Sequence, residues 1–431
     1  MPRRAIDREQ TERELIKRLR HLGPQSRAEL QNALGVSQPT VSRIIKEHKE
    51  RIFQLGQTPN IKYAYKGEST WPIFEVNRSG KISELGELAT IEPHHFLIAN
   101  KIFSDLPYFL CDMRPSGFLG RLIPPMHPEL TLPQDILLWN SLTTLKYLSH
   151  AGLNAPGNLI IGEAMAQKFL LKTGEPRLTP RSKYTANATD LLTLGEPGSS
   201  VAGEQPKFLV INEDGTHIIV KFSPPKKESV GKRMSDILIC EHLAMTILRQ
   251  AGVSAAKTHI IIDGDRTFLE VERFDRIGSK GRQGVLSLGA LTAELVGDAN
   301  SWGEAAEALA RQEKIPIEWP HRVRFLELFG HLIANSDMHL FNLSFLTEHG
   351  TKLLDLAPIY DMCPMSYAPR ANQIVQCHFA PPIQRNRDSA LWEKALPLAT
   401  HFWNEVSTDS RVSREFRAYA KQNLRILDEF A

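Results

Sequence analysis

Three side chains in the last quarter of the sequence have the types and the spacing needed for phosphoryl transfer: Asp337, Asn342 and Asp361. A carboxylate such as Asp337 can accept the proton of a hydroxyl nucleophile. An amide oxygen five residues later and a second carboxylate beyond it are hard ligands that can hold Mg²⁺ against nucleotide phosphates. The pattern favours Asp337 as a catalytic base, with Asn342 and Asp361 as metal ligands. A loop that caps a buried helix is the simpler alternative.

A possible phosphate-binding lysine lies upstream in the expected order. Lys221 ends a predicted strand at 217–222, which follows another predicted strand at 208–211, so the two segments read as a hairpin. Glu241 falls within a helix-like stretch at 237–248, where it could pair with Lys221 and orient it. The alternatives are a solvated lysine at a strand end and a surface glutamate on an amphipathic helix.

Further elements are needed to position these side chains. An apolar, helix-like run at 323–333 leads directly into the Asp337 loop. A small-residue loop at 200–207 precedes the first strand of the hairpin and could bring backbone N–H groups to phosphate, although an ordinary glycine turn would look the same. The strand-like stretch 267–272 runs into a polar link where adenine could bind. The chain has no GxGxxG or GxxxxGK[ST] at the phosphate-binding position, which disfavours a typical eukaryotic kinase and a P-loop NTPase.

Five motifs follow one another along the chain: SVAGEQPK (200–207), IIVKF (218–222), VERFDR (271–276), NSDMHLFNLS (335–344) and LAPIYDM (356–362). Together they resemble the HipA family, the toxin kinases of bacterial type II toxin–antitoxin systems. The resemblance covers roughly residues 70–400 and is weaker at 111–121. It implies an α+β, two-lobed fold related to protein kinases, with Asp337 as the catalytic base and ATP and Mg²⁺ as cofactors.

The resemblance also implies an ATP site, with Asn342 and Asp361 as its Mg²⁺ ligands. Ser200 would be the autophosphorylated serine, whose modification ejects the phosphate loop and switches the kinase off. One position departs from the family, because Phe341 stands where a lysine is common before the metal-binding asparagine. The implied ATP-binding residues are Ala202, Gly203, Glu204, Gln205, Pro206, Lys207, Lys221, Glu272, Arg273, Phe274, His339, Leu340, Phe341, Asn342, Tyr360 and Asp361.

The N-terminal segment predicts a winged helix-turn-helix. A helix at 11–22 is followed by a capping-box pattern, Ser26 to Glu29, and by a third helix at 38–48 that Ser37 could cap. Two strand-like stretches around 57–60 read as the wing. A three-helix protein-docking module is the alternative. The residues expected to contact DNA are Gln38, Thr40, Ser42, Arg43, Lys46 and Lys62.

Charge and composition support this division of the chain. Residues 1–66 hold fourteen Lys and Arg against seven Asp and Glu, whereas the whole chain of 431 residues carries only +3, so the remainder is mildly acidic. The basic segment therefore suggests double-stranded DNA as a partner. Four scattered cysteines, no signal peptide and no long apolar stretch predict a cytoplasmic protein with no membrane contact.

The combined prediction is a toxin-like serine/threonine protein kinase with a DNA-binding N-terminus. Its protein substrate would be a translation component, which family analogy suggests is an aminoacyl-tRNA synthetase, and an antitoxin is a possible further partner. The alternatives are a DNA-binding regulator with an inactive kinase-like part and a toxin that acts on DNA with the same scaffold. The expected domains are a winged helix at 1–68, a subdomain at 69–180, a kinase N-lobe at 181–275 and a helical C-lobe at 276–431.

Overall fold

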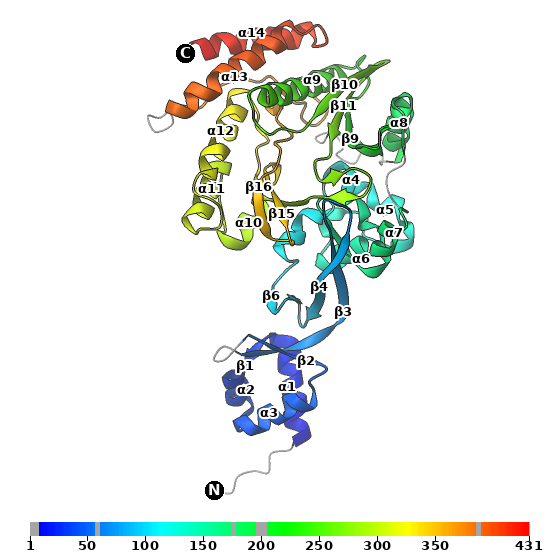
Figure 1. Cartoon of the computed structure of the whole chain (residues 1–431), viewed down its shortest axis with the longest axis vertical. Coiled ribbons are helices and arrows are strands. Elements are labelled where there is room, and N and C mark those ends of the chain that lie inside the picture. The colour runs from blue at the N-terminus through cyan, green and yellow to red at the C-terminus, as the bar shows by residue number, and fades with distance from the viewer. Residues whose placement is uncertain (1–7, 57–60, 174–177, 195–204, 385–388, 431) are drawn as a thin grey trace.

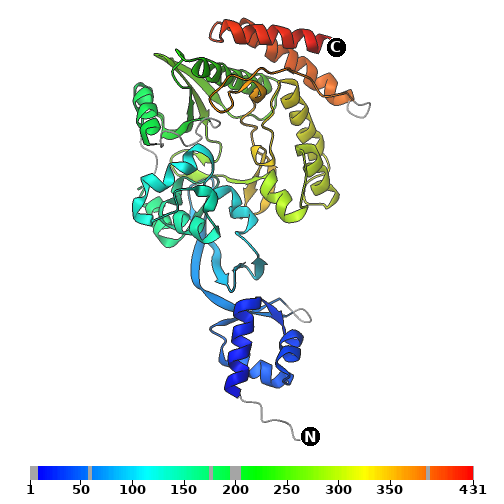
Figure 2. The same ribbon diagram turned by 180° about the vertical axis from the view of Figure 1, so that it is seen from behind.

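The computed structural model describes residues 8–56, 61–173, 178–194, 205–384 and 389–430. Figures 1 and 2 show an N-terminal module that is joined to a larger body by the long strand β3 (Lys62–Val76). The C-terminal helices lie at the opposite end of the molecule from this module. Helices and strands are both abundant, and the paired strands run antiparallel, which fits the predicted α+β class.

The N-terminal module contains three helices whose order matches the sequence prediction. The capping box is reciprocal, since Ser26 Oγ accepts a hydrogen bond from Glu29 N at 3.2 Å and Ser26 N donates to Glu29 Oε2 at 2.6 Å. Ser37 occupies the N-cap position of α3, but its side chain makes no capping bond and contacts Thr40 Oγ1 instead. The predicted N-cap position is therefore confirmed, whereas the side-chain capping bond is not formed. The elements are α1 (Arg8–Leu22), β1 (Gln25–Ser26), α2 (Arg27–Leu34), α3 (Gln38–Glu47) and β2 (Ile52–Leu55).

Strand β3 takes part in both the module and the body. Its first residues pair with β1 and β2, and its later residues pair with β4 and β7. The β3–β4 register shifts between Lys66 and Thr70, and a Cβ at Gly67 would lie 2.2 Å from Thr90 Oγ1, so only glycine fits this close approach. The predicted boundary at residue 68 falls inside this continuous strand. The residues expected to form the wing turn, 57–60, lie outside the described residues.

The middle part of the chain builds the rest of this sheet and a small helical cluster. Its buried side chains, among them Ile73, Leu88 and Leu145, form a separate hydrophobic cluster. The elements are β4 (Ile82–Ile91), β5 (His95–Ile98), β6 (Lys101–Phe103), α4 (Gly117–Arg121), α5 (Ile123–Met126), α6 (Ser141–Ala151), β7 (Leu159–Ile161) and α7 (Glu163–Leu170), with short 3-10 turns η1 (Tyr108–Met113), η2 (Pro128–Leu130), η3 (Ile136–Leu138) and η4 (Gly152–Asn154).

A second sheet carries the predicted hairpin. Strand alternation directs Val220 and Phe222 toward the cluster that includes Tyr184 of α8, and directs Ile219 toward the opposite cluster with Leu238 of α9. Lys221 shares the α9 side with Ile219. The four strands are antiparallel in the order β10-β11-β9-β8. The elements are η5 (Arg181–Lys183), α8 (Tyr184–Leu194), β8 (Lys207–Ile211), β9 (His217–Phe222), α9 (Ser229–Gln250), β10 (Thr258–Asp263) and β11 (Arg266–Glu272).

The remaining chain is mainly helical and contains the largest hydrophobic cluster, which includes the fully buried Trp302, Phe329 and Trp403. Helix α12 packs against α11 and α13 and leads into the Asp337 loop. None of the described helices combines the length and apolar character needed to cross a membrane. The elements are β12 (Arg276–Ile277), β13 (Gly281–Arg282), β14 (Gly284–Ser287), α10 (Leu288–Leu295), α11 (Trp302–Arg311), α12 (Trp319–Leu332), η7 (Leu340–Asn342), β15 (Ser344–Glu348), β16 (Lys352–Leu356), η8 (Met365–Tyr367), α13 (Ser389–Thr408) and α14 (Arg414–Asp428).

Candidate active site

The loop after α12 holds Asp337 and Asn342 together. The helix ends at Leu332, and Ala334 then adopts a left-handed conformation with φ of 60°, which turns the chain into the loop. Asp337 N donates to Asn335 Oδ1 at 3.0 Å, and Asn342 Nδ2 donates to the backbone oxygen of Asp337 at 2.7 Å. Because the Asn342 amide nitrogen is engaged, its Oδ1 remains as the acceptor that could bind a cation.

Lys221 lies between two carboxylates. Its Nζ is 2.6 Å from Glu241 Oε1 and 2.5 Å from Asp361 Oδ1. The lysine side chain is 6% exposed and that of Glu241 is 1% exposed, whereas 35% of the Asp361 side chain is exposed. The expected contact between Lys221 and Glu241 is therefore present, and Asp361 is the member of the cluster that solvent can reach.

Charge and burial compete in this cluster. Burial would lower the pKa of Lys221, but Asp361 and Glu241 outweigh it and raise that pKa. Burial also raises the pKa of Glu241, and Lys221 only partly opposes this effect. For Asp361 the order is reversed, because Lys221 and Lys207 overcome the effect of burial and lower its pKa. Asp361 therefore stays ionised beside a charged lysine, and an ionised carboxylate suits a cation ligand.

Asp337 borders a hollow of about 620 Å³. Partial burial raises the pKa of its carboxyl group; nearby Asp361 adds to this shift, and His339, Lys207 and Lys221 oppose it. A carboxyl group with a raised pKa is a better proton acceptor when ionised. The hollow is lined by His331, Ala334, Asn335, Ser336, Asp337, Met338, His339, Ser366, His378, Phe379, Ala380 and Pro382.

The donor set fits Mg²⁺ and nucleotide phosphate. Asn342 and Asp361 offer an amide and a carboxylate oxygen, which are ligand types that Mg²⁺ prefers. Within the described part of the chain, no three His, Cys, Asp or Glu side chains form a metal-binding group. A cation at these two residues would therefore need oxygen atoms from phosphate and water as further ligands. Glu241 Oε2 is buried with no hydrogen-bond partner among the described residues, which leaves an acceptor inside the cluster.

Part of the predicted phosphate loop lies outside the described residues, namely Ser200, Ala202, Gly203 and Glu204. Of the rest, Pro206 is buried and its backbone oxygen accepts a hydrogen bond from Phe222 N at 3.0 Å. Lys207 pairs with Lys221 across the β8–β9 ladder and lowers the pKa of Asp361, so its charge acts on the site. Gln205 has a buried Nε2 without a partner among the described residues.

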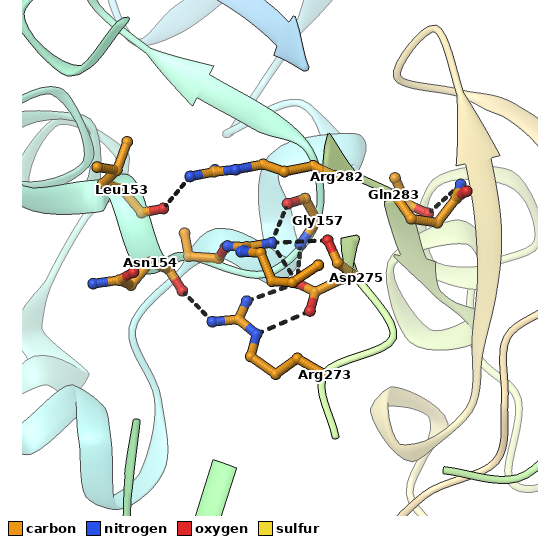
Figure 3. Close-up of polar contacts among 10 residues, drawn as sticks. Leu153, Asn154, Gly157, Arg273, Asp275, Arg282 and Gln283 are labelled. Atoms are coloured by element: carbon orange, nitrogen blue, oxygen red, sulfur yellow. Dashed lines mark hydrogen bonds and ion pairs between the residues drawn. The ribbon is translucent and has the colours of Figure 1, made fainter. Parts of the chain in front are cut away.

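The residues expected at adenine have different surroundings. Glu272 forms an ion pair with Lys257 at 3.2 Å. The Arg273 guanidinium is buried on Asp275 (Figure 3). The Phe274 ring stacks on Tyr360 at 5.9 Å between centroids, beside Asp361. Phe274 is consequently the member of this group whose side chain reaches the site.

The other predicted nucleotide residues surround the Asp337 loop. His339 has its backbone oxygen bound by Trp302 Nε1 at 2.9 Å, and Leu340 packs against the large hydrophobic cluster. Phe341 is 52% exposed, and its ring lies against Gly289. Tyr360 donates its hydroxyl hydrogen to Phe341 O at 3.0 Å. These contacts join the Tyr360–Asp361 segment to the turn that carries Asn342.

Three further side chains at or near the site were not predicted from the sequence. His331 and His378 line the hollow beside Asp337. His378 stands in an irregular stretch with no motif, so its spacing gave no signal. Asp275 was visible within VERFDR, but nothing in that motif showed that it anchors Arg273.

The predicted DNA-contacting residues lie on the N-terminal module. Gln38, Arg43 and Lys46 are exposed along α3, and Lys62 is exposed at the start of β3. Thr40 and Ser42 are half-buried on α3. The six side chains are thus grouped on one helix and the neighbouring strand.

Comparisons with known proteins place these observations in a family. Residues 67–170 match the YjjJ-like toxin middle domain, and residues 199–427 match the HipA-like C-terminal domain. The chain is 33% identical over 419 residues to Toxin YjjJ of Escherichia coli strain K12, with 93% of this chain and 94% of the relative covered.

Two solved structures show weaker similarity. A chain from the complex of the Shewanella oneidensis MR-1 toxin–antitoxin system HipA, HipB and its operator DNA is 17% identical, with a TM-score of 0.47 over 75% of this chain and 85% of that one. The Helicobacter pylori proinflammatory kinase CtkA is 16% identical, with a TM-score of 0.37 over 54% of this chain and 91% of that one. The family matches and the full-length relative show that the chain belongs to the YjjJ-like toxins, a family with a HipA-like C-terminal domain.

Proposed function

We propose that this protein is an ATP- and Mg²⁺-dependent serine/threonine protein kinase. The observation that carries the proposal is the buried contact of Lys221 with both Glu241 and Asp361, close to the Asp337–Asn342 loop. The buried Glu241 fixes the Lys221 side chain, and the accessible Asp361 also contacts it. A lysine held in this way is suited to bind phosphate. The relative's toxin activity fits an enzyme that modifies a cellular target.

The chain's own residues account for the proposed steps. Asp337 accepts the proton of a serine or threonine hydroxyl that enters the hollow, and the Asn342 amide fixes the backbone on which this carboxylate stands. Lys221 offsets phosphate charge, and Glu241 keeps its amine in place. Bound Mg²⁺, held by Asn342 and Asp361, would supply charge neutralisation at the transferred group.

Phosphate transfer from ATP tests this proposal. Asp337→Asn keeps the shape of the side chain but removes the proton acceptor, so we expect transfer to fall by about 10²-fold or more. The same samples test Ser200 by mass spectrometry, since phosphate should occur on Ser200 in wild type and not in Asp337→Asn. Unchanged transfer in Asp337→Asn would remove this residue from the mechanism.

We also propose that the N-terminal module is a winged helix-turn-helix that binds duplex DNA. The basic segment, the reciprocal cap of α2 and the exposed side chains of α3 support this. The protein substrate would be a component of translation, such as an aminoacyl-tRNA synthetase. An antitoxin is a further proposed partner, which the HipA-like C-terminal domain supports.

A second candidate function is a DNA-binding regulator that binds nucleotide without transferring phosphate. Phe341 favours it, because a half-exposed aromatic ring beside Asn342 contributes no charge to a transferred phosphoryl group. ATP binding with no transfer by wild-type protein would support this function over the kinase. Cleavage of DNA in the same incubation would instead indicate a toxin that acts on DNA.

A further inference from the structure

Asp275 is a buried carboxylate at the centre of a polar network (Figure 3). Arg273 binds it through two nitrogen atoms, with Nε–Oδ1 and Nη2–Oδ2 distances of 2.9 and 2.7 Å. Arg276 Nη1 and Gly157 N lie 2.8 and 2.9 Å from Oδ2. Burial alone would raise the pKa of Asp275, but the two guanidinium groups outweigh it and hold that pKa well below its usual range.

The same arginines bind backbone oxygen atoms in the middle part of the chain. Arg276 Nη1 donates to Gly157 O at 2.8 Å and Arg276 Nη2 donates to Ala155 O at 2.7 Å. Arg273 Nη1 donates to Asn154 O at 3.3 Å. The network therefore fixes the 273–276 segment against the 154–157 segment, which is more than a hundred residues earlier in the sequence.

In the sequence, Phe274 lies between Arg273 and Asp275, which are joined by two hydrogen bonds. Its ring stacks on Tyr360 with an angle of 29° between the planes. Tyr360 donates to Phe341 O and bonds Ser344 Oγ at 2.7 Å, and it directly precedes Asp361. A continuous series of contacts thus leads from Asp275 through Phe274 and Tyr360 to the segments that carry Asn342 and Asp361.

We propose that Asp275 is a positioning residue for the nucleotide and metal site. By fixing Arg273 and Arg276 on the middle domain, it holds Phe274 against Tyr360, and Tyr360 in turn fixes the Phe341–Asn342 turn and Asp361. The middle domain then acts as a rigid support for the site. This inference rests on the proposed nucleotide-binding function, but it makes a separate prediction about order around Tyr360.

The chain offers a matched control in Glu75. This carboxylate is also buried and also joins the two parts of the chain, since it accepts hydrogen bonds from Asn158 Nδ2 at 3.0 Å and Gly350 N at 3.3 Å. Among the described residues, its hydrogen-bond partners are Asn158, His349 and Gly350, all of which lie outside residues 273–283. Loss of Glu75 should therefore weaken the attachment of the middle part without releasing Phe274.

The experiment uses the full chain with Asp275→Asn, Arg273→Lys and Glu75→Gln. MgATP affinity is measured by calorimetry. Hydrogen exchange is measured without nucleotide at residues 341–344 and 356–361, which leaves out His349 and Gly350 because Glu75 itself bonds them. We expect Asp275→Asn to weaken MgATP binding by roughly 2- to 30-fold and to speed exchange in 341–344 and 356–361. Arg273→Lys should act in the same direction, and Glu75→Gln should change neither property, even where it lowers the unfolding midpoint.

A double-mutant cycle separates positioning from general destabilisation. The affinity losses of Asp275→Asn and Phe274→Leu should be less than additive when combined, whereas those of Glu75→Gln and Phe274→Leu should be additive. Wild-type affinity and exchange in a folded Asp275→Asn protein would overturn the proposal. Failure of both Asp275→Asn and Arg273→Lys to fold would show that the network has a structural role alone. If wild type binds no MgATP, the proposed function fails, and the exchange comparison still decides the role of Asp275.

Discussion

The side chain of Lys221 shows how single residues acquire special chemistry in this protein. Its ammonium group is buried, yet two carboxylates keep it charged. A buried charge without a partner is costly, so the cluster depends on all three members being present. Because only Asp361 is partly open to solvent, an incoming ligand would meet this carboxylate first.

His217 gives a residue-level prediction about stability and pH. Burial lowers the pKa of its imidazole from 6.5 to about 4, and the nearby charges of Arg276, Arg273 and Arg282 add to this shift. In the unfolded chain the imidazole of His217 takes up a proton near pH 6.5, whereas in the folded chain it does so only near pH 4. The stability from neutral His217 should therefore be present above pH 6.5 and be lost as the pH falls toward 4, by about 3 kcal/mol.

Urea unfolding of the full chain between pH 7 and 4 checks this prediction, with His217→Gln as the comparison. Glutamine does not titrate, so the variant should lose less stability over this range than wild type does. Equal pH dependence in the two proteins would show that His217 does not contribute to the acid sensitivity.

Individual elements are positioned by local bonds and by the packing of their buried faces. Helix α9 places Glu241 opposite β9, where strand alternation directs Lys221 to the same side. Helix α12 ends in the turn that presents Asp337. In both cases the apolar residues determine how the element packs, and the polar residue is carried into the site.

The helix caps of the N-terminal module provide a prediction at this scale. Ser26 caps α2 with a reciprocal capping box, whereas Ser37 has the N-cap position of α3 but no capping bond. Ser26→Ala should therefore destabilise the module by about 1 kcal/mol, and Ser37→Ala should cost clearly less.

Hydrogen exchange of the α2 and α3 amides in the full chain, together with urea unfolding, measures both effects. Faster exchange should be confined to α2 in Ser26→Ala. A larger effect of Ser37→Ala would contradict this account of the two caps.

At the scale of the whole molecule, the two parts of the chain that β3 joins differ in net charge. The first 66 residues are strongly basic, and the remainder is mildly acidic. Figure 1 shows the basic module projecting away from the body. A basic module that is separated from an acidic body can approach DNA without strong repulsion from the rest of the protein.

We therefore predict that the full chain binds duplex DNA with a steep salt dependence. Lys46→Ala, which removes one exposed cation on α3, should flatten the log–log salt slope by about one unit at most. If Arg43 contacts a guanine, Arg43→Ala should weaken binding to the DNA sequence that contains this guanine by roughly 1–3 kcal/mol.

Gel shifts and fluorescence titrations at several salt concentrations test these values. Lys352→Ala, an exposed lysine on β16, is the matched control and should leave the slope unchanged. Binding that does not depend on salt, or the absence of binding at low salt, would rule out the DNA interface.

The sequence by itself determined the features that depend on residues close together in the chain. The β8–β9 hairpin, the Ser26–Glu29 capping box and the helix before Asp337 are where the residue patterns predicted them, because their hydrogen bonds and apolar faces are set locally. The family could also be recognised from short motifs, and the comparisons confirm it.

Only the tertiary structure decided where several of these side chains point. Arg273 stands in a recognisable motif, yet its guanidinium binds Asp275 and Asn154 O and leaves Phe274 to reach Tyr360. The hollow beside Asp337 likewise depends on Phe379 and His378, which lie about forty residues later in an irregular stretch. Such contacts join distant segments, and they form only when the packing of whole elements brings those segments together.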